Sequence, residues 1–167
     1  MNTANIPPAA RLLAEPEQLD YLHTTGTGIP RGMSAWQVYA AMTDGIPAWL
    51  AWSFRIRDGI SRLFGVKPIR GFSRHNPHDV PPVGGMADFF RVEAVGSEQL
   101  VLLAADSYLA VMVSIDITRR PDASADRTDV TASVKNRNAF GRLYMLPVAL
   151  MHGAVVRRML RNIGNAV

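Results

Sequence analysis

The chain has 167 residues, a formal net charge of +4 at pH 7 and no cysteine. The missing cysteines exclude disulfides, thiolate zinc sites, iron–sulfur clusters and cysteine nucleophiles, and they fit a cytoplasmic protein. Hydrophobic residues make up 48% of the chain and charged residues 19%, which is enough apolar material for a sizeable core. We therefore expect one folded domain over residues 21–167, preceded by an extended, proline-containing arm over residues 1–20.

Charge and hydropathy also limit the expected partners. All but Lys67 and Lys135 of the basic residues are arginine, and their scatter along the chain favours a solvated surface over a nucleic-acid interface. The longest apolar run, from Leu143 to Val156, is interrupted by Pro147 and His152 and is shorter than the ~20 residues of a membrane-spanning helix. The first twenty residues lack the basic start and apolar core of a secretory signal. We expect neither nucleic acid nor a membrane span.

The first part of the domain predicts a strand and two helices. Residues 20–27 alternate as a short strand does, with His23 on one of its faces. A helix begins at Ser34, because Gln37 follows at the spacing of a capping box, and it ends at Asp44–Gly45. A second helix is expected over residues 47–65. Its apolar stripe consists of Trp49, Trp52, Ile56, Ile60 and Leu63.

The second part predicts an antiparallel sheet followed by one long helix. After a loop over residues 66–85, four strands are expected, over residues 89–95, 100–105, 108–117 and 128–135. Their short connections imply antiparallel neighbours. Residues 140–163 then show a helical period with an apolar face. Pro147 inside this segment either bends a single helix or separates two successive helices.

Three segments resemble a known family. They are "IPAWLAWSFRIRDGISRLFGVK" (46–67), "DSYLAVMVSID" (106–116) and "NRNAFGRLYMLPVALMHGAVVRRMLRNI" (136–163). In this order they resemble an uncharacterised bacterial family, a domain of unknown function in the SRPBCC, or START-like, superfamily. That superfamily also contains birch-pollen-allergen-like proteins and polyketide cyclases.

The resemblance implies an α+β helix-grip fold. In such a fold a curved antiparallel sheet is joined by two short helices in the N-terminal half, and a long C-terminal helix packs across the sheet. It also implies a hydrophobic cavity between the sheet and that helix. It brings no catalytic residues and no cofactor, and Gly26-Thr27-Gly28 lacks the remainder of a dinucleotide-binding fingerprint.

We therefore predict that the cavity binds a small, largely apolar molecule. The predicted ligand-binding residues are Tyr108, Met112, Arg142, Tyr144, Val148, Met151 and His152. Because the inward face of the third strand of the sheet is ambiguous, Leu109, Val111 and Val113 are the alternative lining. Arg142 offers a bidentate fork to an acidic group of a ligand, or else ties the helix to a surface acid. Asn138 is the expected N-cap of the last helix.

An enzyme is the second hypothesis, of the cofactor-independent cyclase, dehydratase or isomerase type. Its acid–base candidates are Asp106, Tyr144 and His152. The position of Asp106 favours a hairpin turn residue over a catalytic one, and a histidine on a helix more often has a structural than a catalytic role. The hypothesis requires these side chains to converge on one shared space.

Two further hypotheses concern metal binding and protein partners. His75, His78 and Asp79 share the long loop, but Pro77 separates the histidines and no fourth ligand is evident, so we predict no metal site. A structural or homodimeric partner-binding module is the third hypothesis for the chain, to be recognised by an exposed apolar patch.

Overall fold

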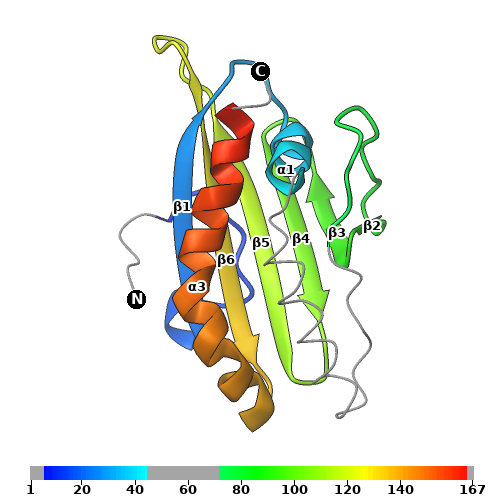
Figure 1. Cartoon of the computed structure of the whole chain (residues 1–167), viewed down its shortest axis with the longest axis vertical. Helices are drawn as coiled ribbons and strands as arrows, with labels where there is room; N and C mark the ends of the chain where they lie inside the picture. Colours follow the sequence, from blue (N-terminus) through cyan, green and yellow to red (C-terminus); the bar gives the residue numbers. More distant parts are fainter. Residues whose placement is uncertain (1–5, 45–71, 165–167) are drawn as a thin grey trace.

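The structure, a computed structural model, describes residues 6–44 and 72–164, without the side chains of residues 144, 147, 150, 151 and 164. It contains a single curved, six-stranded sheet in the order β1-β6-β5-β4-β3-β2, and every neighbouring pair is antiparallel (Figure 1). The strands are β1 (Tyr21–Ile29), β2 (Met86–Ala87), β3 (Phe90–Val95), β4 (Gln99–Ala105), β5 (Leu109–Thr118) and β6 (Asp126–Asn136). The helical segments are η2 (Pro16–Gln18), α1 (Ala35–Thr43) and α3 (Ala139–Gly164).

The α+β class and the antiparallel sheet predicted from the sequence are confirmed. The strands expected over 20–27, 89–95, 100–105, 108–117 and 128–135 correspond to β1, β3, β4, β5 and β6 with small differences at their ends. The two-residue strand β2 was not predicted, because it is too short to show any alternation. The helix predicted over 47–65 lies outside the described residues.

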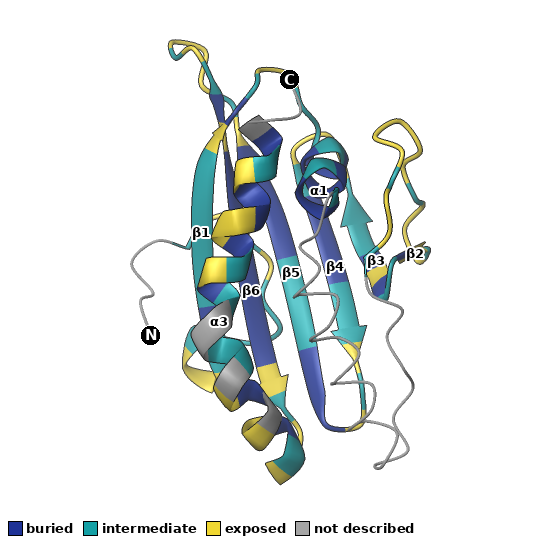
Figure 2. Cartoon of the chain, in the orientation of Figure 1, coloured by how far each residue is buried: buried dark blue, intermediate teal, exposed yellow. Residues whose placement is uncertain are grey.

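The two faces of the sheet differ in chemistry because side chains alternate along β5 and β6. Ile115 pairs with Val130, and both belong to the main core cluster with Trp36 of α1 and Met159 of α3. Ser114 points the other way, and its hydroxyl accepts a hydrogen bond from the Arg11 amide at 3.2 Å. The helices therefore cover the apolar face of the sheet, and Figure 2 shows that most residues of β6 are buried.

The N-terminal arm covers the opposite face. The amide of Leu13 donates to the Ser133 hydroxyl at 3.2 Å, two residues after the equivalent bond from Arg11 to Ser114. Next to them, Gln99 donates from its amide to the carbonyl of Ala9 at 2.6 Å. These contacts fasten the arm across β4, β5 and β6, behind the sheet in Figure 1. As a result Ser114 and Ser133 are fully buried.

The last helix, α3, has 26 residues and continues through Pro147 as one element. Asn138 caps its first turn, as predicted, by accepting a hydrogen bond from the Gly141 amide at 3.0 Å. Glycine is required at 141, because a Cβ there would lie 2.2 Å from the carbonyl oxygen of Tyr108. The helix packs against β1, β6 and α1.

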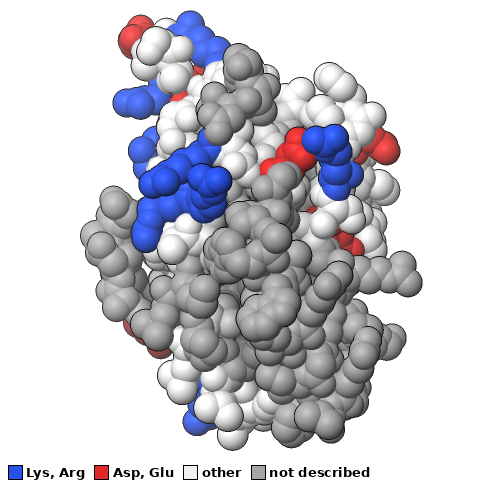
Figure 3. Space-filling model, in the orientation of Figure 1, with Lys and Arg blue, Asp and Glu red and all other residues white. Residues whose placement is uncertain are grey.

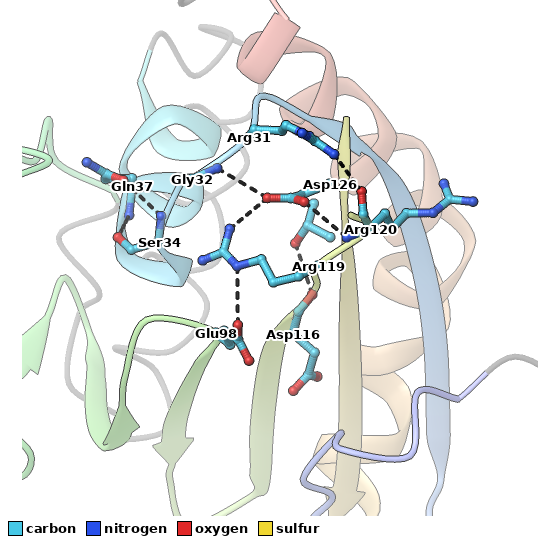
Figure 4. Close-up of polar contacts among 10 residues, drawn as sticks. Arg31, Gly32, Ser34, Gln37, Glu98, Asp116, Arg119, Arg120 and Asp126 are labelled. Carbon is cyan, nitrogen blue, oxygen red and sulfur yellow. Dashed lines mark hydrogen bonds and ion pairs between the residues drawn. The ribbon is translucent and has the colours of Figure 1, made fainter. Parts of the chain in front are cut away.

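A buried carboxylate joins the β5–β6 hairpin to the connection between β1 and α1 (Figure 4). Asp126 pairs with the guanidinium of Arg119 at 2.8 Å and accepts from the amides of Arg120 and Gly32, each at 3.2 Å. The hydrogen bond from Arg119, followed by that from the Arg120 amide, lowers the pKa of Asp126 below its usual value. This junction fixes the start of α1.

Helix α1 begins with the predicted capping box. The Ser34 hydroxyl accepts from the Gln37 amide at 3.2 Å, and the Gln37 side chain accepts from the Ser34 amide at 2.8 Å. Both residues lie beside the Asp126 junction in Figure 4. The cap satisfies two helix-terminal amides that have no partner inside the helix.

Replacing Ser34 tests how much the capping box contributes to the stability of the protein. Ser34→Ala is expected to lower the free energy of unfolding by about 1 kcal/mol, because the Gln37 amide loses its acceptor. Urea denaturation measures the change. Ser124→Ala, at an exposed serine in the β5–β6 loop, is the control and should remain within about 0.5 kcal/mol of the original chain. Equal stability of the Ser34 variant and the original chain would contradict the assignment.

Candidate functional site

Three rings meet between β1 and α3. Tyr21 and His23 lie two residues apart on β1, on the face that pairs with Val134 and Ala132 of β6. His152 of α3 approaches both, with ring centroids 5.5 Å from Tyr21 and 5.8 Å from His23, in edge-to-face geometry. The predicted face of the first strand and the predicted helix thus bring one tyrosine and two histidines together.

Two nitrogens of this cluster are buried without a hydrogen-bond partner in the described structure. They are Nε2 of His23 and Nδ1 of His152. An unpaired buried polar atom costs about 1–3 kcal/mol, so native proteins usually supply a partner from protein, water or ligand. The pair is therefore an incomplete polar site within a mainly apolar interface.

Burial keeps both imidazoles uncharged. Desolvation, with a smaller effect from His23, lowers the pKa of His152 to about 4. Desolvation also lowers the pKa of His23, and the charge of Arg157 adds to the effect. Burial raises the pKa of Tyr21. At neutral pH the cluster therefore presents neutral groups that can donate or accept hydrogen bonds.

The close approach of α3 to β1 depends on Gly153. A Cβ at this position would lie 3.3 Å from both Cε1 and Nε2 of His23, tighter than an ordinary contact. Arg157 follows one turn later and is exposed, together with Arg158 and Arg161. These arginines form the basic area over the C-terminal half of α3 in Figure 3. The histidine pair thus lies beneath a positively charged surface.

The remaining predicted site residues fall into separate places. Tyr108 and Val148 pack in one apolar cluster, where the Tyr108 ring meets Phe140 edge-on at 5.2 Å. Met112 alternates with the inward residues of β5 and lies on the face under the N-terminal arm, so Val111 and Val113 point toward the helices instead. The side chains of Tyr144 and Met151 lie outside the described residues. Met112 therefore lies apart from Tyr108 and Val148, whose cluster also includes Tyr21, the ring neighbour of His152.

Arg142 and Asp106 lie near the other end of α3. Arg142 is exposed in the first turns of the helix. Asp106 lies in the β4–β5 hairpin, where its amide donates to the Leu109 carbonyl at 2.9 Å and its carbonyl accepts from Arg137 at 3.0 Å. The backbone of Asp106 thus acts as expected of a turn residue.

A second polar cluster, which the sequence did not reveal, is centred on Asp88. Its side chain is fully buried and accepts three hydrogen bonds. One oxygen accepts from the Tyr39 hydroxyl at 2.6 Å and contacts Nε2 of His75 at 2.9 Å, and the other accepts from the Ser73 amide at 2.7 Å. The backbone of Asp88 has φ +55°, a conformation that few residues other than glycine adopt.

The cluster around Asp88 is closed by aromatic rings. Trp36 stacks on Tyr39 at 5.5 Å and meets His75 edge-on at 5.2 Å. Burial, with further effects from the charge and the hydrogen bond of Asp88, raises the pKa of Tyr39, so its hydroxyl remains a donor. His75 also borders an open groove of about 460 Å³ beside α1. Other residues of the groove are Arg31, Gln37, Ala40, Ala41 and Asp44.

The loop histidines take different roles from those of a metal site. His75 turns inward to Asp88, whereas His78 and Asp79 are exposed. Across residues 6–44 and 72–164, no group of three or more histidine, aspartate or glutamate side chains is placed to hold a metal ion. No helix within those same ranges is long and apolar enough to cross a membrane.

The histidine pair makes stability depend on pH. A native pKa of about 4 for His152, against 6.5 when unfolded, means that the unfolded chain takes up the proton first as pH falls. Stability should therefore be complete above pH 6.5 and decrease toward pH 4, by about 3 kcal/mol from His152. Urea denaturation across this range measures the effect.

Two phenylalanine variants separate this effect from general acid sensitivity. His152→Phe is expected to flatten the pH dependence, because it removes the titrating ring. His78→Phe, which replaces an exposed loop histidine, should leave the pH dependence as it is. A His152→Phe protein with the full acid loss would refute this account.

Comparison with known proteins places these clusters in a family. The family model described as "Protein of unknown function (DUF2867)" matches residues 16–159. The match includes β1 to β6 and most of α3, so it contains both polar clusters. A search of curated proteins gives no match. On the family match, the chain belongs to the DUF2867 family of proteins of unknown function.

Proposed function

We propose that the protein binds a small, largely apolar molecule between the sheet and α3, with one polar atom of the ligand meeting His23 and His152. The supporting observation is the pair of buried imidazole nitrogens without partners in the described structure. A hydroxyl group suits this pair best, because it can donate to a nitrogen that has a lone pair and accept from a nitrogen that bears a hydrogen. The apolar surroundings would hold the rest of the ligand.

The proposal extends to the fold group and the location. We infer a helix-grip fold of the SRPBCC, or START-like, type, in a protein of the bacterial cytoplasm. The order of elements supports the fold, because a final helix packs against β1 and β6 of a curved antiparallel sheet. Ligand binding between the layers is an analogy at the level of the fold, and the histidine pair is the local reason to adopt it.

The geometry gives less support to acid–base catalysis by the residues predicted for it. Asp106 lies beside Tyr108, whose ring contacts Phe140 near the start of α3. His152 lies twelve residues further along the helix, or ~18 Å at 1.5 Å per residue. A proton donor must lie within hydrogen-bond reach of its target, or one water away. This separation along α3 favours binding over acid–base catalysis by Asp106 and His152 together.

Ligand binding is tested by thermal shift with medium-chain alcohols and with hydrocarbons of matched length, and by native mass spectrometry of the purified protein. An alcohol at 100 times its Kd should add about 2.7 kcal/mol of stability. For a chain of this size the midpoint of unfolding rises by roughly 5–10 °C. Hydrocarbons should give smaller shifts, because they leave the nitrogens unpaired.

His152→Phe should abolish the preference for alcohols, since the ring keeps its bulk and loses its hydrogen-bonding atoms. His78→Phe is the matched control and should retain the preference. The proposal fails if no compound of either class shifts the transition and no small molecule accompanies the purified protein.

A second candidate function, a homodimeric module, is favoured by one observation. Leu143 and Leu146 on α3 are 66% and 64% exposed. Residues three apart on a helix lie on the same side, so these leucines form one outward apolar pair. A second copy of the chain would cover it.

Light scattering after size exclusion tests this alternative. If the leucine pair forms a dimer contact, the original chain elutes at twice its mass of 18.3 kDa, and a Leu143→Gln/Leu146→Gln protein elutes as a monomer. A monomeric original chain at high protein concentration rules the dimer out.

A further inference from the structure

His75 borders the groove beside α1, and residues on the side away from the groove hold its ring in one orientation. His75 packs against both Trp36 and Tyr39, with ring centroids 5.2 Å and 5.5 Å away. Its Nε2 atom is 2.9 Å from a carboxylate oxygen of Asp88. The side chain of His75 is 17% exposed and that of Asp88 is fully buried, so only the histidine reaches the groove.

The hydrogen-bond network assigns the tautomer of His75. An ionised carboxylate has acceptors only, so Nε2 of His75 must bear the hydrogen that points to Asp88. The Nδ1 atom of a neutral ring then has the lone pair, and it makes no hydrogen bond among the described residues. Tyr39 and Ser73 donate to the same carboxylate and hold it in place. This is the arrangement of an oriented general base.

The groove offers a hydrogen-bond donor as well as a base. Gln37 uses its amide oxygen in the capping box, which leaves its amide nitrogen to face a ligand. Arg31 also borders the groove, but its guanidinium donates to the carbonyls of Arg120 and Pro121. A volume of about 460 Å³ lies within the size range of small-molecule sites. A base together with a donor for a developing oxyanion suits acyl transfer.

We propose that this groove is a second site, in which His75 acts as the general base for hydrolysis of small acyl esters. Nδ1 of His75 takes a proton from water, and the water oxygen bonds to the acyl carbon. The bond between the acyl carbon and the alcohol oxygen then breaks, and the alcohol leaves with the proton returned by His75. Asp88 is a positioning residue that stabilises the protonated ring. The site is independent of the ligand proposed beneath α3.

Hydrolysis of p-nitrophenyl acetate at neutral pH tests the proposal, with release of p-nitrophenolate as the readout. The original chain should exceed the rate of an equal concentration of N-acetylhistidine at least tenfold. His75→Gln should lose at least nine-tenths of this activity, while its amide still donates to Asp88. His78→Gln, three residues further along the same loop and exposed, should stay within twofold of the original chain.

Asp88→Asn distinguishes orientation from folding. It should lower kcat at least tenfold with less than a twofold change in KM, because an amide no longer dictates the tautomer. Circular dichroism confirms that each variant is folded.

Chemical modification gives a test that needs no variant. Diethyl pyrocarbonate should abolish hydrolysis in proportion to the modification of His75, mapped by peptide mass spectrometry, and hydroxylamine should restore it. The proposal is overturned if activity survives complete modification of His75, if His78→Gln loses as much activity as His75→Gln, or if the original chain is no faster than N-acetylhistidine.

Discussion

The register between β5 and β6 determines what every other element can contact. With Ile115 opposite Val130, both side chains enter the core under α1 and α3. A shift of one residue would turn Ser114 and Asp116 toward the helices and place the isoleucines under the N-terminal arm. The helices would then pack against polar side chains, and the arm would lose the hydroxyl groups that accept its amides.

The two polar clusters are opposite in character. Around Asp88 every carboxylate oxygen has a donor, and the rings of Trp36 and Tyr39 restrict the position of His75. Between β1 and α3, by contrast, His23 and His152 each retain a buried nitrogen with no partner in the described structure. A network in which every polar atom has a hydrogen-bond partner can hold a side chain in position for chemistry. A buried polar atom without a partner can form a hydrogen bond with a ligand or water instead. The first cluster is therefore suited to proton transfer and the second to binding.

Local patterns predicted the fold better than they predicted the sites. The capping box of Ser34 and Gln37 and the alternation along β5 are short-range features, and both appear as expected. Met112 was placed on the wrong side of the sheet as a first choice, because Ala110 and Met112 make the second face of β5 apolar enough to resemble the first. His75 and Asp88 are thirteen residues apart in irregular chain, so only the folded loop brings them together. No periodicity connects such a pair.

The contact between Gly153 and the ring of His23 sets the width of the layer in which the proposed ligand would lie. Helix α3 approaches β1 at a residue without a side chain, so each carbon atom added at position 153 would change the packing between them in a small step. A side chain at 153 would press on Cε1 and Nε2 of His23, so this ring or the helix would have to shift by a few tenths of an ångström. In related chains, a different residue at this position would therefore change the space between α3 and β1 that is open to the proposed ligand.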